Sequence, residues 1–149
     1  MNMKKFIKGF IWLLFLIYIA VLVYFLFFCE KYGRTATDDY HYNLIPFSEM
    51  KRYFIYYDLI GFKGFFLNII GNILAFVPLG ICIPLLVRGY RKFLLVFFYG
   101  ILFTVCVETI QLLLKVGSFD VDDMILNTLG VAIGYVCYYI FYKWYKRKR

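Results

Sequence analysis

One ionisable side chain, Glu108, interrupts an apolar stretch from Phe93 to Leu114 that is long enough to cross a lipid bilayer. A charge at the centre of a membrane helix costs roughly 2.5–3.5 kcal/mol on the insertion scale, so such residues usually face the interior of a helix bundle and mark a functional site. Gln111 follows three residues later and shares the same helical face. A buried carboxyl group in this setting can receive a polar ligand or act as a general base.

Carboxyl and carboxamide groups also interrupt the neighbouring hydrophobic stretches. A helix rises about 1.5 Å per residue, which places Asn72 about 10 Å and Glu108 about 9 Å below the outer ends of their helices. Asn68, Gln111 and Asn127 lie about 4–5 Å below the same surface. We therefore predict that polar groups from three helices converge at the outer side and line a ligand-binding cavity. The predicted cavity residues are Asn68, Asn72, Glu108, Gln111, Asp120, Asp123 and Asn127.

Four apolar stretches must position these side chains. The chain has 149 residues, of which 64% are hydrophobic, and a mean hydropathy of +0.76. Each stretch is near the roughly 20 residues that a helix needs to cross a bilayer, and backbone hydrogen bonding in lipid requires that such spans be helical. The sequence predicts an all-α polytopic membrane protein, a single domain over residues 1–149. Its predicted spans are residues 9–29, 65–87, 93–114 and 124–142.

The distribution of charge predicts the orientation. The N-terminus, the link 88–92 and the C-terminal tail together carry eleven basic residues and no acid. The segments on the other side carry eight of the nine acids, and the ninth is Glu108. Because basic loops stay in the cytoplasm, we expect both termini and the link to be cytoplasmic. The basic residues form short clusters that flank the membrane, which argues against nucleic acid as a partner and favours contact with membrane lipids.

A long outer loop, residues 30–64, separates the first two predicted spans. It contains Asn43, Pro46 and Phe47 in a short motif, and Ser48 follows as a plausible helix start. From Met50 to Phe62 the loop is rich in tyrosine and phenylalanine but also carries charges. We interpret this part as an interfacial helix that lies on the outer leaflet.

Small residues and cysteines are distributed over the spans. Gly130 and Gly134 are spaced so that a neighbouring helix can approach closely, either within this chain or in a second copy. The cysteines have no paired spacing, which favours packing roles over a disulfide framework or a metal site. We expect no metal and no cofactor. The four cysteines are Cys29, Cys82, Cys106 and Cys137.

Four short motifs occur in order along residues 43–140. They are Asn43-Leu44-Ile45-Pro46-Phe47, then Asn68 and Asn72 followed by Phe76-Val77-Pro78-Leu79-Gly80, then Glu108 with Gln111, and finally Asp120 and Asp123 followed by Asn127-Thr128-Leu129-Gly130 and Gly134. In this combination the chain resembles the VanZ-like family of membrane proteins. The resemblance implies a bacterial cytoplasmic membrane protein with a role in low-level resistance to glycopeptide antibiotics such as teicoplanin.

Two functions from different classes fit these residues. The first is a non-catalytic envelope protein whose outward cavity binds a lipid-linked wall precursor or hinders a lipoglycopeptide from reaching it. The second is a membrane enzyme that modifies a lipid headgroup, with Glu108 as general base and with Asp120 and Asp123 as oxygen ligands for a hard cation. A purely structural alternative is a hydrogen-bond network that joins three helices. A small transporter or a scaffold is a further alternative. The absence of histidine from every span favours the first function.

Overall fold

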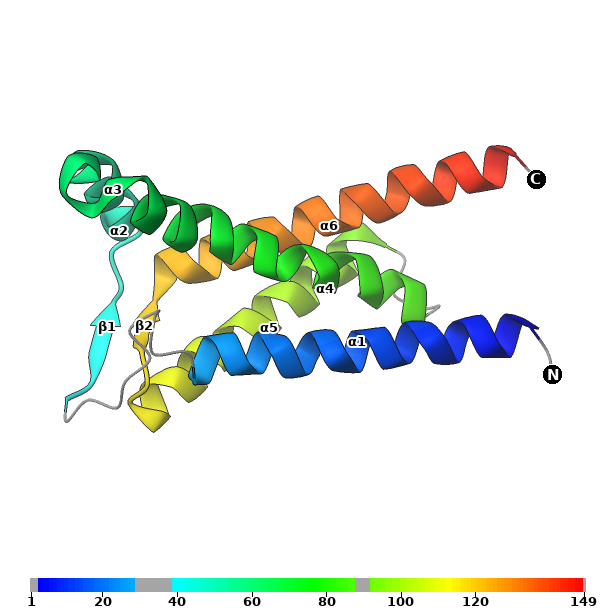
Figure 1. Cartoon of the computed structure of the whole chain (residues 1–149), viewed down its shortest axis with the longest axis horizontal. Helices are drawn as coiled ribbons and strands as arrows, with labels where there is room; N and C mark the ends of the chain where they lie inside the picture. Colours follow the sequence, from blue (N-terminus) through cyan, green and yellow to red (C-terminus); the bar gives the residue numbers. More distant parts are fainter. Residues whose placement is uncertain (1–2, 29–38, 88–91, 149) are drawn as a thin grey trace.

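The chain folds as a bundle of long helices with a small two-stranded sheet at one end (Figure 1). The computed structural model describes residues 3–28, 39–87 and 92–148. The elements are α1 (Met3–Phe27), β1 (His41–Asn43), α2 (Ser48–Ile55), α3 (Tyr57–Phe65), the π-helical turn η2 (Phe66–Gly71), α4 (Asn72–Leu86), α5 (Phe93–Leu114), β2 (Ser118–Asp120) and α6 (Val121–Arg147). Four helical segments are long and apolar enough to cross a membrane, which confirms the predicted all-α polytopic fold.

The helix bounds differ from the predicted spans mainly at the ends. α5 has the predicted bounds, Phe93–Leu114. α6 begins at Val121, three residues before the predicted start, and continues to Arg147. The second crossing extends back through η2 and α3, so that the helical path runs from Tyr57 to Leu86. Cys29, residues 30–38 of the outer loop, and Arg88 and Arg91 of the basic link lie outside the described residues.

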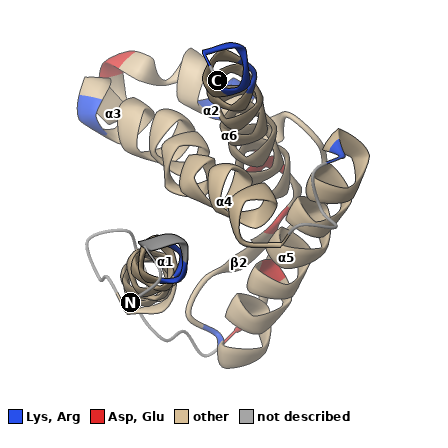
Figure 2. Ribbon diagram, turned by 90° about the vertical axis from the view of Figure 1, so that its right-hand side faces the viewer, with Lys and Arg blue, Asp and Glu red and all other residues tan. Residues whose placement is uncertain are grey.

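The closest helix contact in the bundle is between α4 and α6. A Cβ atom on Gly134 would lie 2.1 Å from the carbonyl oxygen of Val77, and one on Gly130 would lie 2.2 Å from that of Ile73. Gly80 of α4 is equally close to the backbone of α6 at Val131. Only glycine permits this approach, so the predicted small-residue contact is made within the chain. Helix α1 lies to one side of α4, α5 and α6 (Figure 2).

The predicted interfacial helix consists of two helices. α2 begins at Ser48 as expected but ends at Ile55, because the backbone of Tyr56 leaves the helical region (φ −99°, ψ 25°). A second break occurs inside α3 at Gly61, with φ 72° and ψ 165°, a conformation open to glycine because it has no Cβ atom. Both breaks let this segment turn back toward the bundle before it becomes the second crossing (Figure 1).

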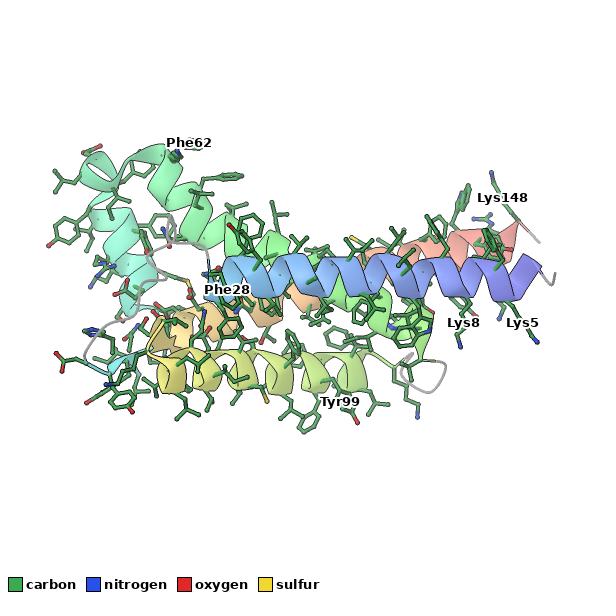
Figure 3. The ribbon with its side chains drawn as sticks, turned by 60° about the horizontal axis from the view of Figure 1, so that its bottom comes forward. Lys5, Lys8, Phe28, Phe62, Tyr99 and Lys148 are labelled. Atoms are coloured by element: carbon green, nitrogen blue, oxygen red, sulfur yellow. The ribbon has the colours of Figure 1, made fainter. Side chains whose placement is uncertain are left out.

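Strands β1 and β2 join two loops that are far apart in the sequence. They pair in parallel, with His41 opposite Ser118 and Asn43 opposite Asp120. The strands, α2 and α3 lie at one end of the bundle, which we call the polar end (Figure 1). The two chain termini lie at the other end, which we call the terminal end, together with Lys5, Lys8 and Lys148 (Figure 3).

Candidate polar site at one end of the bundle

The face of α5 that carries Glu108 meets the polar end of α1 and strand β2. The Glu108 carboxylate is 1% exposed, and its Oε2 accepts the backbone N–H of Asp120 at 3.2 Å. Gln111 is fully buried and donates through Nε2 to the carbonyl oxygen of Leu26, in the last turn of α1, at 2.8 Å. Glu108 therefore holds strand β2, and Gln111 holds α1, against the same face of α5.

Asp120 connects the outer-loop motif to the start of α6. Its Oδ1 accepts the backbone N–H of Asp122 at 2.8 Å, which caps α6, and the Nδ2 of Asn43 at 3.0 Å. Asn43 in turn accepts the Ser48 hydroxyl at 2.8 Å and the Ile45 N–H at 3.2 Å through its own side-chain oxygen. The asparagine of the motif thus links β2 to the beginning of α2.

Asp122 has a role that the sequence analysis did not predict. Its Oδ2 accepts the backbone N–H groups of Glu49 and Met50 at 2.8 and 3.0 Å, and its Oδ1 accepts that of Phe47. The N-terminus of α2 has no side-chain cap of its own, so a carboxylate from α6 caps it across the fold. The only sequence signal was that three acids, Asp120, Asp122 and Asp123, occur within four residues, although one acid is enough to cap the start of a helix.

The remaining predicted residues are only partly brought together. Asn72 donates through Nδ2 to Asp123 Oδ1 at 2.6 Å, which joins the second crossing to α6. Asn127 lies deeper and donates to the Thr104 hydroxyl of α5 at 3.0 Å. Asn68, in the π-helical turn, donates to the carbonyl oxygen of Gly64 in the adjacent turn at 2.8 Å. Asn68 therefore stabilises an irregular turn and makes no such link to another crossing.

Burial changes the electrostatics of the acids outside the membrane-spanning helices. Desolvation raises the pKa of Asp120 above its ordinary value, although hydrogen bonds from Asp122 and Asn43 oppose the shift. Desolvation likewise raises the pKa of Glu49, despite its 2.6 Å ion pair with Arg52. Negative charge is thus concentrated and incompletely solvated at the polar end. A ligand that brings a positive charge or hydrogen-bond donors would stabilise these ionised carboxylates.

Two buried amide oxygens at this end accept no hydrogen bond from the described protein groups. They are Oε1 of Gln111, one turn after Glu108 on α5, and Oδ1 of Asn127 on α6, whose amide nitrogen bonds to Thr104, about one turn before Glu108. Buried polar atoms are nearly always paired in folded proteins, so both offer acceptors to a ligand or to water. Among the described residues, no three His, Cys, Asp or Glu side chains converge in a way that suits a metal ion.

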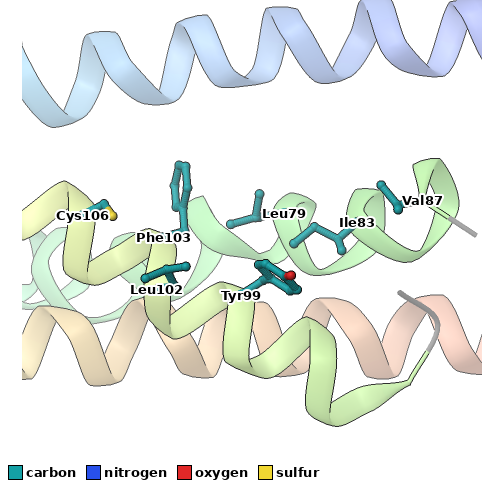
Figure 4. Close-up of a pocket in the computed structure, with 7 residues that line it drawn as sticks. All are labelled: Leu79, Ile83, Val87, Tyr99, Leu102, Phe103 and Cys106. Atoms are coloured by element: carbon teal, nitrogen blue, oxygen red, sulfur yellow. The ribbon is translucent and has the colours of Figure 1, made fainter. Parts of the chain in front are cut away.

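Crevices open between the helices of the described part of the chain, and two of them bear on the site. The larger, of about 560 Å³, lies between α4 and α5 and is lined by side chains such as Leu79, Ile83, Tyr99 and Phe103 (Figure 4). It contains none of the predicted site residues. The other, of about 370 Å³, lies between α1 and the second crossing, and Asn72 forms part of its lining. Of these two crevices, the α1 crevice is the one that includes a residue of the polar network.

Four membrane-crossing helices and a buried network of carboxyl and carboxamide groups at one end define a polytopic membrane protein with a polar site among its helices. The VanZ/LLP1 family model matches residues 15–142, and the chain belongs to that family. Protein VanZ from Enterococcus faecium is 27% identical over 127 residues, which cover 82% of this chain and 69% of that protein. No solved structure matches. The match confirms the resemblance and includes the second half of α1, which lay outside the predicted family region.

Proposed function

We propose that this protein is a non-catalytic component of the bacterial cell envelope. Its polar end binds an amphipathic molecule at the outer surface of the cytoplasmic membrane, either a lipid-linked wall precursor or a lipoglycopeptide such as teicoplanin. Binding limits the action of the lipoglycopeptide. The proposal depends on one observation: carboxyl and carboxamide groups of the second, third and fourth crossings make hydrogen bonds to neighbouring elements, and one of them, Asn72, also lines a crevice.

The location of the network supports a binding role. Glu108, Gln111 and Asn127 are each at most 1% exposed, yet two of them retain acceptor oxygens without a partner among the described residues. A network that served only to join helices would gain by pairing these atoms, since an unpaired buried polar group costs about 1–3 kcal/mol. The unpaired acceptors and the excess of acids therefore favour a site that exchanges hydrogen bonds with a ligand.

The orientation of the protein supports an outer site. The terminal end carries the basic clusters, and these favour the cytoplasmic side. Both termini are then cytoplasmic, and the polar end faces the wall-synthesis side of the membrane. Family membership supports the connection to teicoplanin, because the resemblance implies a role in resistance.

Drug tolerance tests the proposal directly. Expression of the protein in a teicoplanin-sensitive bacterium should raise the inhibitory concentration of teicoplanin, and Glu108→Gln should remove the gain. The glutamine keeps an oxygen that accepts the Asp120 N–H but removes the charge. Thr109→Val is the matched control, since Thr109 is exposed on the same helix and bonds only to the Val105 carbonyl of its own turn.

Two outcomes would contradict the proposal. Unchanged tolerance with Glu108→Gln at normal protein abundance would exclude the polar site from the effect. A change in the host lipid profile that requires both Glu108 and a divalent cation would instead support the enzyme alternative. Measurement of protein abundance by immunoblot and of lipid composition by mass spectrometry in the same strains separates these results.

A further inference from the structure

The crevice between α1 and the second crossing has two different parts. Most of its wall is apolar, with Leu22 and Phe25 of α1 opposite Leu67 and Leu74. Its volume of about 370 Å³ lies within the range of roughly 300–1,000 Å³ that is usual for small-molecule sites. Because the wall belongs to apolar helices long enough to cross a membrane, the crevice suits an alkyl chain.

The polar part of the crevice is Asn72. Its Nδ2 donates to Asp123 Oδ1 at 2.6 Å, so the crevice leads to a carboxylate in the first turn of α6. Farther from the polar end, the Tyr18 hydroxyl donates to the Ala75 carbonyl at 2.8 Å and crosses between the two walls. A ligand in the crevice would therefore place its polar group at Asn72 and its alkyl chain alongside Tyr18.

The charge around the polar part is negative. Asp120 and Asp122 adjoin Asp123 in the sequence, and Glu108 contacts Asp120. Of the four described cations at this end, Lys51 and Lys63 are exposed on α2 and α3, and the other two have partners near the loops. Arg52 is paired with Glu49 at 2.6 Å, and the ammonium of Lys115 lies 4.7 Å from the ring centre of Tyr40. A cationic headgroup is favoured at this position, and an anionic one is repelled.

We infer that the α1 crevice is a lateral entrance from the membrane for an amine-bearing amphiphile, whose alkyl chain lies between α1 and the second crossing and whose ammonium group pairs with Asp123. This inference rests on the proposed function and specifies the chemical class of the ligand and its route. The larger crevice between α4 and α5 has no comparable polar end and is not part of this route.

Photo-crosslinking in a membrane tests the entrance. The full-length protein is placed in neutral phosphatidylcholine nanodiscs with a hexadecylamine probe that carries a diazirine on its chain. Mass spectrometry should place the crosslinks on crevice residues of α1 and the second crossing. The same chain with a sulfate headgroup should label these residues about fivefold less, the order expected for one partly solvated charge pair.

Two variants distinguish the part of the crevice that binds the alkyl chain from the part that binds the ammonium headgroup. Gly71 lines the crevice, and a Cβ atom there would meet no atom closer than 3.8 Å, so Gly71→Phe directs a ring into the crevice without a clash at its first carbon. Labelling of the crevice by the amine probe should then be lost. Asp123→Asn keeps an acceptor for Asn72 but removes the charge, and should abolish the preference for amine over sulfate. Gly9→Phe is the control, because a Cβ atom at Gly9 meets nothing within 4 Å.

The outcomes distinguish this inference from the proposed function. Equal labelling by the amine and sulfate probes, or unchanged labelling of Gly71→Phe, would overturn the lateral entrance. If Glu108→Gln nevertheless abolished teicoplanin tolerance, only the entrance would fail. The opposite result is also possible: the labelling depends on Gly71 and Asp123, but expression of the protein gives no teicoplanin tolerance. That result would support the entrance and contradict the proposed drug-related role.

Discussion

At the scale of single residues, neighbouring acids of similar chemistry have different structural partners. Asp120 caps α6 and holds Asn43, Asp122 caps α2, and Asp123 accepts from Asn72. All three lie at the start of one helix, where the helix dipole favours negative charge. That favourable position stabilises several carboxylates at once, so the start of α6 can form hydrogen bonds with β1, α2 and α4.

The cap that Asp122 provides should be essential for the ordering of the outer loop. Asp122→Asn keeps one acceptor oxygen and replaces the other with an NH₂ group, which cannot accept a hydrogen bond. Some of the N–H groups at the start of α2 would then lose their acceptor, and the rest would bond to a neutral oxygen. Hydrogen bonds to charged groups contribute roughly 1.5–3 kcal/mol each. We expect a lower melting temperature and faster hydrogen exchange at the amides of Glu49 and Met50.

The matched control is Asp58→Asn, which removes an exposed acid from the adjacent helix α3. Its exchange pattern should equal that of the unmodified protein. Equal protection of residues 47–50 in the Asp122 and Asp58 variants would show that the α2 start is held by other contacts. The comparison is made in the same nanodiscs, because the exposed aromatic side chains of α2 and α3 would contact lipid.

At the scale of elements, the molecule is built on a glycine-lined contact between α4 and α6. Three glycines bring the two backbones together, and Phe76 and Val131 are completely buried beside them. In a bilayer there is little hydrophobic drive for helices to associate, so this close packing must supply much of the association energy. The polar network then joins helices that the glycines have already placed.

The Gly134 contact should therefore tolerate no added carbon atom. A Cβ atom there would lie 2.1 Å from a backbone oxygen, which cannot rotate away. We expect Gly134→Ala to lower the free energy of unfolding by about 1–3 kcal/mol, as is usual for overpacked cores. Gly9→Ala adds the same atom where nothing lies within 4 Å. Thermal unfolding of both variants in one detergent is the measurement, and equal melting temperatures would contradict the close α4–α6 crossing.

The sequence predicts the crossings well and their connections poorly. The bounds of α5 follow from hydrophobicity alone, since the run of apolar residues ends where the helix ends. The β1–β2 pair could not be predicted, because it joins three-residue strands whose partners are about 77 residues apart. The cap by Asp122 joins segments that are similarly far apart in the sequence and was missed for the same reason. Asn68 was predicted to line the cavity, but it lies in a π-helical turn and bonds to the Gly64 carbonyl of the adjacent turn.

At the scale of the whole molecule, charge and polarity are divided between the two ends. The polar end holds the sheet and the buried acids, whereas the terminal end holds lysines of α1 and α6 (Figures 1 and 3). Both chain termini lie at the terminal end of the bundle. The proposed function and the lateral entrance both require the polar end to face the cell exterior.

Labelling of single cysteines in intact cells tests this orientation. In a background without Cys29, Cys82, Cys106 and Cys137, a cysteine is introduced at Tyr42, which is 68% exposed at the polar end, or at Lys148, which is exposed at the terminal end. A membrane-impermeant maleimide should modify Tyr42→Cys in intact cells and Lys148→Cys only after the cells are opened. Basic residues that flank the spans produce this orientation because they resist translocation. The reverse pattern would place the acids in the cytoplasm, where a lipoglycopeptide outside the cell could not reach them.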